Sequence, residues 1–310
     1  MKHLLTVLFL AISLNNFAQY EFPQKELCEE MQKRILAVQL LDGDNESNKN
    51  LNSALKSVMD ENWKWTAIEY ISSENIEKIL KEKNTKYAVL TQHGDMREDV
   101  RSGFIDENGR PHRIGVAGGN QTFKYTAFTF SFYNFELLLP NNKKSSTITE
   151  IGFANSELTR IDYIYLAQQL NHLISNSLKE TPMKEFFNVE RNNKACTERT
   201  LVILKDFIRE KEISDISKYY EHPYKLVDFD QYQDIIINKK PGYGYAKIIW
   251  SNQLNMYAWV VADSETGETI SLLTFGGVKF GRHHDANDII KVNHLKYVTS
   301  KMQKINNKYK

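Results

Sequence analysis

The segment Tyr257-Ala-Trp-Val-Val261 is followed by Asp263-Ser-Glu-Thr-Gly267 and then by a second apolar run that ends at Phe275. Tyr, Trp and Val favour strands, and a short polar segment containing Ser and Gly favours a turn. These three pieces predict two neighbouring strands joined by a tight turn. The same succession of strand, polar turn and strand occurs earlier in the chain, between Tyr133 and Phe153.

Outward from these strands, segments of the first half match segments of the second half in the same order. Both halves start with a short apolar run typical of a buried strand, Ile35–Leu40 in one and Leu201–Leu204 in the other. The other matched pairs are Trp65–Tyr70 with Tyr224–Phe229, Tyr87–Leu90 with Tyr245–Ile248, Tyr133–Leu137 with Tyr257–Val261, Thr147–Phe153 with Thr269–Phe275, and Leu170–Leu173 with Val292–Leu295.

This order predicts an α/β protein with a mixed sheet, built as two tandem copies of a β-α-β-α-β-β-β-α unit whose second helix is weak in the second copy. Chance similarity between two generic α/β segments is the alternative. The first copy is expected at residues 28–180 and the second at residues 200–310. A polar linker containing Pro182 is expected at residues 181–199.

The first eighteen residues have the three parts of a secretory signal. Lys2 gives a basic start, Leu4–Leu14 is a short apolar stretch, and Ala18 is a small residue at the expected cleavage position. The apolar stretch is too short to span a bilayer, which requires about 20 residues. We therefore expect residues 1–18 to be a signal peptide, the alternative being a buried amino-terminal strand or helix. The mature chain is expected to have no transmembrane helix and to be periplasmic or secreted, with association with the outer-membrane surface left open.

The charge balance argues against nucleic acid as a partner. Residues 1–18 hold one Lys and no acidic residue, so 39 of the 40 basic side chains and all 39 acidic ones belong to the mature chain. Proteins that bind nucleic acid usually carry a basic excess or stripe, and no dense run of Lys and Arg occurs here. The hydrophobic content of 41% is sufficient for packed cores.

The chain contains two cysteines, Cys28 and Cys196, and each lies shortly before an expected first strand. Two thiols that reach an oxidising compartment can form a disulfide. The alternative is two inert buried thiols.

The first copy carries an extra segment at residues 93–122, which we expect to form an inserted hairpin. This segment leads into an aromatic stretch, and loops that lengthen on a fixed scaffold often carry binding function. A protein partner is therefore expected to contact residues 93–139. A hairpin that covers the edge of the sheet is the alternative. The candidate binding residues are Phe123, Tyr125, Phe128, Phe130 and Phe132.

Histidine and acidic residues are densest at His283, His284 and Asp285. Zinc needs three or four ligands that converge in space, whereas adjacent histidines usually point apart. These residues are therefore a candidate metal site, with the capping of a helix as the alternative. The sequence contains no motif of a serine hydrolase, a zinc protease or a phosphate-binding loop, so we expect no cofactor and no catalytic residues.

Several segments together resemble the curli-secretion channel family and the amino-terminal domain of the Tol-Pal translocation protein. They are the strand Ile35–Leu40, the stretch Glu74–Leu80 that leads into Lys86–Leu90, and the strand, turn and strand within Val261–Glu268. The resemblance implies a non-enzymatic envelope domain used in assembly, secretion or partner binding. This chain departs from that pattern by having two copies and no lipid site, so pore formation is not implied.

These observations predict an exported, non-enzymatic binding or assembly protein of the bacterial cell envelope that contacts a protein partner. One alternative is a secreted hydrolase assisted by a metal. The other is a purely structural tandem domain of an envelope complex. The sequence leaves the identity of the partner and the oligomeric state open.

Overall fold

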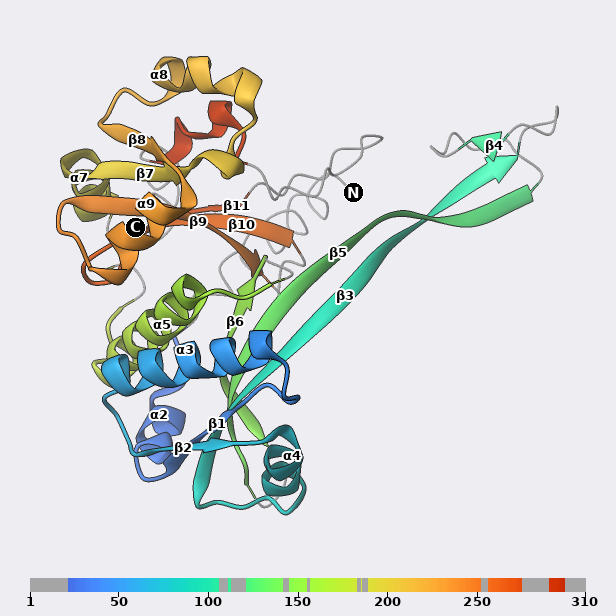
Figure 1. Ribbon diagram of the computed structural model, residues 1–310, viewed down its shortest axis with the longest axis vertical. Helices are drawn as coiled ribbons and strands as arrows, with labels where there is room; N and C mark the ends of the chain where they lie inside the picture. Colours follow the sequence, from blue (N-terminus) through green and yellow to red (C-terminus); the bar gives the residue numbers. More distant parts are fainter. Residues whose placement is uncertain are drawn as a thin grey trace, which may run out of the picture.

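The computed structural model describes residues 22–105, 111–112, 121–141, 145–154, 157–182, 185, 189–251, 256–274 and 290–298. The chain forms an α/β structure around one mixed sheet, which confirms the predicted fold class (Figure 1). The expected signal peptide lies outside the described residues. Among the residues that the structure describes, no helix combines the length and apolar character needed to cross a membrane.

The first half contains the strands and helices expected from the sequence, in the expected order. Asn45 precedes the long helix α3, and its side chain accepts a hydrogen bond from the backbone N–H of Asn48, as in a typical N-cap. The elements are α2 (Lys25–Met31), β1 (Ile35–Gln39), α3 (Glu46–Asn62), β2 (Ile68–Ile71), α4 (Ser73–Lys81), β3 (Tyr87–Ile105), β4 (Pro111–His112), β5 (Gln121–Leu139), β6 (Ser146–Phe153) and α5 (Arg160–Leu178).

The second half repeats the strands but replaces the long helix after its first strand with short helical turns. The elements are α7 (Val189–Glu198), β7 (Thr200–Leu204), η2 (Lys205–Phe207), η3 (Glu210–Asp215), α8 (Ile216–Tyr219), β8 (Tyr224–Val227), α9 (Phe229–Ile237), β9 (Tyr243–Ser251), β10 (Met256–Asp263), β11 (Thr269–Thr274) and η4 (Val292–His294). The second helix, expected to be weak, is the nine-residue α9. The reduced helix is therefore the first one of this half.

The two halves have the same strand order and the same strand directions. The first half has the order β2-β1-β3-β5-β6, and the second has the order β8-β7-β9-β10-β11. In both, the first three strands in the chain pair in parallel and the last two are added antiparallel.

Three local details recur at equivalent places. α4 and α9 are each followed by a lysine with positive φ, Lys83 at 53° and Lys239 at 48°. The pairing of β5 with β6 shifts register between Leu137 and Leu138, and the pairing of β10 with β11 shifts register between Val261 and Ala262. An arginine precedes the first strand in both: Arg34 donates to the carbonyl of Pro140 at 2.6 Å, and Arg199 pairs with the carboxylate of Asp263.

The structure also corrects two details of the sequence comparison, one through strand register and one through a helix. Ile35 pairs with Tyr87 and Thr200 pairs with Tyr243, so the counterpart of Tyr87 is Tyr243 rather than Tyr245. In addition, α7 lies within residues 181–199, which were expected to be a linker. This helix packs on β7 and β11 and buries Cys196, so the second half begins before residue 200.

The two halves join through a short antiparallel contact between β6 and β9. Gly152 pairs with Trp250, and Phe153 pairs with Ile249. A Cβ atom at Gly152 would lie 2.3 Å from the carbonyl oxygen of Trp250, so the contact requires glycine. The sheets of the two halves are thereby continuous.

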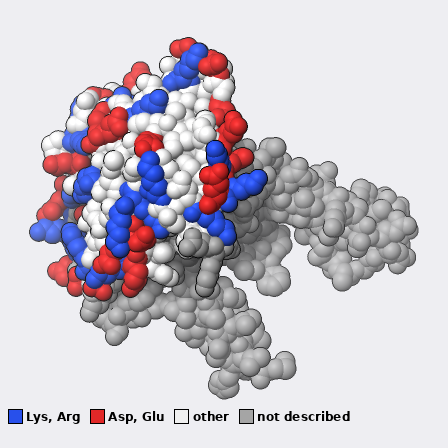
Figure 2. Space-filling model, turned by 90° about the horizontal axis from the view of Figure 1, so that it is seen from below, with Lys and Arg blue, Asp and Glu red and all other residues white. Residues whose placement is uncertain are grey.

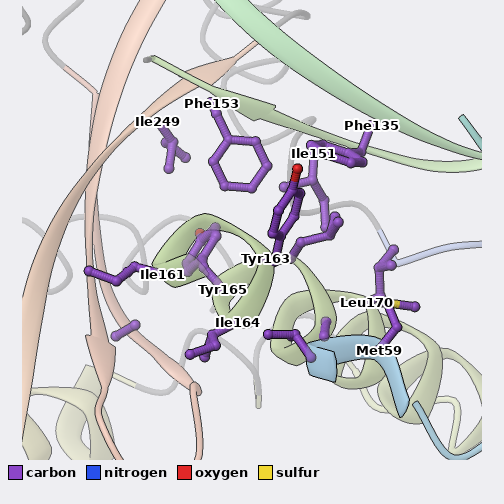
Figure 3. Close-up of a cluster of buried hydrophobic side chains, with 14 of the residues drawn as sticks. Met59, Phe135, Ile151, Phe153, Ile161, Tyr163, Ile164, Tyr165, Leu170 and Ile249 are labelled. Carbon is purple, nitrogen blue, oxygen red and sulfur yellow. The ribbon is translucent and has the colours of Figure 1, made fainter. Parts of the chain in front are cut away.

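The core beside this junction is centred on helix α5, which lies between the two halves in Figure 1. Figure 3 shows Tyr163 and Tyr165 of α5 directed towards Phe135 and Phe153 of the sheet. The Phe153 and Tyr165 rings meet edge to face, with centroids 6.0 Å apart, and Ile249 of the second half belongs to the same cluster. One core therefore includes side chains of both halves.

A buried ion pair crosses the junction. Lys247 of β9 is 5% exposed and donates to the carboxylate of Asp162, which is fully buried at the start of α5. The second oxygen of Asp162 accepts the backbone N–H and the hydroxyl of Thr159, which completes a capping box. The Lys247 ammonium also lies 5.3 Å from the centre of the Phe153 ring, which adds a cation–π contact to the ion pair.

Lys247→Met should lower the free energy of unfolding by about 3 kcal/mol, because it leaves the Asp162 carboxylate buried without its partner. The double variant Lys247→Met with Asp162→Asn should recover most of that loss, since an amide oxygen can still accept from Thr159. Urea unfolding of the three proteins measures both effects. A single variant as stable as the wild type would contradict this account of the junction.

Candidate functional site

The most prominent feature outside the body of the protein is an arm formed by β3 and β5. Each strand has 19 residues, and the two pair from Val89 with Leu138 to Ile105 with Gln121. Among the described strands, β1 pairs with β3 at residues 87–90 and β6 pairs with β5 at residues 133–139, so these neighbours lie at the base of the ribbon. The rest projects from the body as two strands, with β4 paired near its far end (Figure 1).

Four of the five candidate binding residues lie on the projecting part of β5. In the backbone register Phe123 is opposite Gly103, Tyr125 is opposite Arg101, Phe128 is opposite Asp99, and Phe130 is opposite Arg97. Three of these four pairs therefore match an aromatic residue with a charged one. The extra segment predicted at residues 93–122 supplies the ends of both strands rather than a separate insertion.

Phe132, the fifth candidate, lies at the base of the arm and is only 2% exposed. Its ring stacks on Trp250 of β9, with centroids 4.8 Å apart and an angle of 21° between the planes. Trp250 in turn meets Tyr257 of β10 edge to face at 5.1 Å. Phe132 is thus a core residue that fixes the arm to the second half, and the prediction that it is a surface contact is corrected.

Two carboxylates oppose each other at the base of the arm. Glu136 of β5 pairs in register with Glu150 of β6. Burial raises the pKa of Glu136, the negative charge of Glu150 raises it further, and His93 opposes the shift. Like charges at facing positions of an antiparallel pair destabilise the sheet.

The two cysteines are free and lie in different clusters of buried side chains, Cys28 in the core that both halves share and Cys196 in a separate cluster of the second half. Burial raises the pKa of both thiols, that of Cys196 to about 12. This agrees with two inert buried thiols and not with the bridge between the halves.

The metal candidates His283, His284 and Asp285 lie outside the described residues. Within the part of the chain that is described, no three His, Cys, Asp or Glu side chains are grouped to hold a metal ion.

A cavity of about 440 Å³ lies where the two halves meet. Helix α5, whose opposite face packs in the core, presents a polar stripe to it. The stripe consists of Gln168, Asn171, His172, Ser175, Asn176 and Lys179. The remaining lining residues come from the end of α3, the segment after α5, α7, the end of α9 and the turn between β10 and β11; they are Asn62, Lys64, Thr181, Glu185, Arg191, Lys239, Glu265, Thr266 and Glu268.

His172 lies at the centre of the charges around this cavity. Burial lowers its pKa, Glu268 opposes the shift, and the cations Arg191, Lys179 and Lys64 lower the pKa further. Arg191 pairs with Glu268 at 2.8 Å. The sequence alone identifies His172 only as a polar residue of a helix. The helical spacing of the six stripe residues does indicate that one face of α5 is polar and lies outside the core.

Comparison of the chain with family models, with curated proteins and with solved structures finds no match. The resemblance to the curli-secretion channel family and to the Tol-Pal translocation protein therefore stays a prediction. The function must be inferred from the geometry of the arm, the junction and the cavity.

Charge is distributed evenly over the face of the protein shown in Figure 2. Basic and acidic side chains are interspersed over the described part of that face, with no broad area of one sign. On this face the electrostatic surface offers no stripe for a polyanion.

Glu136→Gln should raise the free energy of unfolding at pH 7 by roughly 0.5 kcal/mol, because it removes one of two facing charges. The raised pKa means that the folded state binds this proton more tightly than the unfolded state does, so the carboxylate costs stability as the pH rises above its ordinary pKa. At pH 3, where both states are protonated, the variant and the wild type should be equally stable. Urea unfolding at the two pH values tests this, with Glu77→Gln at an exposed position of α4 as the control.

Proposed function

We propose that this chain is an exported, non-enzymatic binding or assembly protein of the cell envelope and that a protein partner contacts the β3–β5 arm. The arm is the observation that carries the proposal. A two-stranded ribbon that leaves the sheet adds little to the core, and it exposes two strand edges that a single chain normally keeps short. An extended ribbon of this kind suits contact with another macromolecule.

The comparison of the two halves supports this interpretation. We infer from the shared strand order, the matching register shift and the matching arginines that the halves are copies of one unit. The strands equivalent to β3 and β5 are β9 and β10, which have nine and eight residues and form no arm. The arm is therefore an elaboration of one copy, which is where a specific function is expected on a duplicated scaffold.

Export is part of the proposal and rests on residues 1–18. The folded structure is compatible with a periplasmic or a secreted location, because the two buried thiols need no particular redox environment. The candidate metal ligands of the hydrolase alternative, His283, His284 and Asp285, lie outside the described residues. The structural alternative differs only in having no separable partner, which the following experiment decides.

Replacing residues 97–130 by Asn-Gly should shorten the arm to its base and abolish recovery of the partner in a pull-down from an envelope extract. Phe132 and its stack on Trp250 remain, so the thermal unfolding midpoint should change little. Equal recovery of the same protein by the full-length and the shortened chains would refute a role for the arm in binding.

Paired point variants separate the contributions of the two strands of the arm. Phe128→Ser with Phe130→Ser should weaken partner binding by at least about tenfold, because aromatic residues, Phe included, are enriched at protein interfaces. Arg97→Ser with Asp99→Ser changes the residues opposite them and is the matched control. Its effect should be smaller, and a larger loss with the charged pair than with the aromatic pair would contradict the assignment to the aromatic residues.

A further inference from the structure

The cavity at the junction has no part in contact through the arm, and it exists only in the folded chain with both halves present. The first half contributes the end of α3 and the polar stripe of α5. The second half contributes Arg191 of α7, Lys239 after α9 and Glu265, Thr266 and Glu268 of the β10–β11 turn. Its volume of about 440 Å³ lies in the range of about 300–1,000 Å³ that is typical of small-molecule sites.

The chemistry of the lining selects against an apolar ligand. Every residue that lines the cavity is polar or charged, and seven of the fifteen carry an uncharged amide or hydroxyl group. Such groups exchange hydrogen bonds with a ligand rich in hydroxyl groups. Asn171 and Asn176 are held in place, because Asn171 donates to the carbonyl of Asn62 and Asn176 donates to the carbonyl of His172, both at 2.8 Å.

The charges around the cavity favour an anion. Lys64, Lys179 and Lys239 form no ion pair with any carboxylate among the described residues. Lys239 donates instead to the amide oxygen of Asn62 at 3.2 Å, and Lys64 lies 5.3 Å from the centre of the Trp65 ring. The lining holds four basic and three acidic residues, and Glu268 is paired with Arg191, so the three lysines face only the two carboxylates of Glu185 and Glu265.

The cations concentrate around His172. Arg191, Lys179 and Lys64 act on this imidazole with one opposing carboxylate, Glu268. A positive field inside a concave and partly enclosed site attracts anions more strongly than the same charges on an open surface. The lining as a whole has one more basic than acidic side chain, and the cations around His172 outnumber the carboxylate there.

We propose that the junction cavity binds a small hydroxylated organic anion of the sugar-acid class, with its carboxylate held between Lys64, Lys179 and His172. The amide and hydroxyl side chains of the stripe hold the hydroxyl groups of the ligand. Because the walls come from both halves, such a ligand also stabilises the contact between the halves by mass action.

Isothermal titration calorimetry of the full chain with glucuronate tests this proposal. Saturable binding of glucuronate, with no binding of neutral glucose, is expected. Lys64→Ala and Lys179→Ala should each weaken the affinity about tenfold, since each removes a charge-assisted contact. Both lysines are exposed, so the variants should fold, and Lys78→Ala on the exposed face of α4 is the matched control that should bind as the wild type does.

Absence of saturable glucuronate binding overturns the proposal, as do wild-type affinities in both lysine variants. Inorganic phosphate that binds as tightly as glucuronate would show a simple anion site and overturn the assignment of the hydroxyl contacts. The chain with the shortened arm should still bind glucuronate, which separates this result from the outcome of the pull-down.

Discussion

The close approach of β6 to β9 is the constraint on which the rest of the structure depends. Two residue pairs join the sheets of the two halves within the described part of the chain, and one of them places the Gly152 backbone against the carbonyl of Trp250, where no side chain fits. Glycine at this position weakens an isolated strand, because it loses more conformational entropy than other residues when it is ordered. The loss is offset here by the side chains that the contact brings together. Trp250 reaches Phe132, Lys247 reaches Asp162, and the aromatic rings of α5 are closed off from solvent.

The ion pair at this junction marks a difference between the two halves. By register, the residue of β3 that corresponds to Lys247 is Thr91, which has an uncharged side chain and donates to the carbonyl of Glu136. A buried ion pair contributes little net stability, because desolvation of both charges opposes their attraction. The pair instead fixes the orientation of α5 relative to β9, because Asp162 accepts hydrogen bonds from both Thr159 and Lys247. We infer that the pair specifies how the halves meet, while the apolar cluster provides most of the free energy.

Much of the fold follows from local sequence pattern. The apolar run Ile35–Leu40 becomes β1, the run Leu201–Leu204 lies in β7, and the predicted turn at residues 263–267 joins β10 to β11. The predictions that were wrong or missing concern contacts between residues far apart in the sequence. The alternation that makes Phe132 a strand residue carries no sign of its contact with Trp250, which comes from the second half of the chain. The polar composition of residues 181–199 suggested a linker, yet α7 packs on β11 through the buried Cys196, with Ala195 against the same cluster. The cavity could not be predicted, because its walls come from segments more than 100 residues apart.

The arm and the junction are mechanically connected. A ribbon of two strands is barely stable in water, so its direction must be set by what holds its base. On one side β1 pairs with β3 only as far as Leu90, and the side chain of Gln92 donates to the carbonyl of Gln39 where that pairing ends. On the other side the base of β5 rests on Trp250 through Phe132. The second half is thus the support that orients the arm of the first.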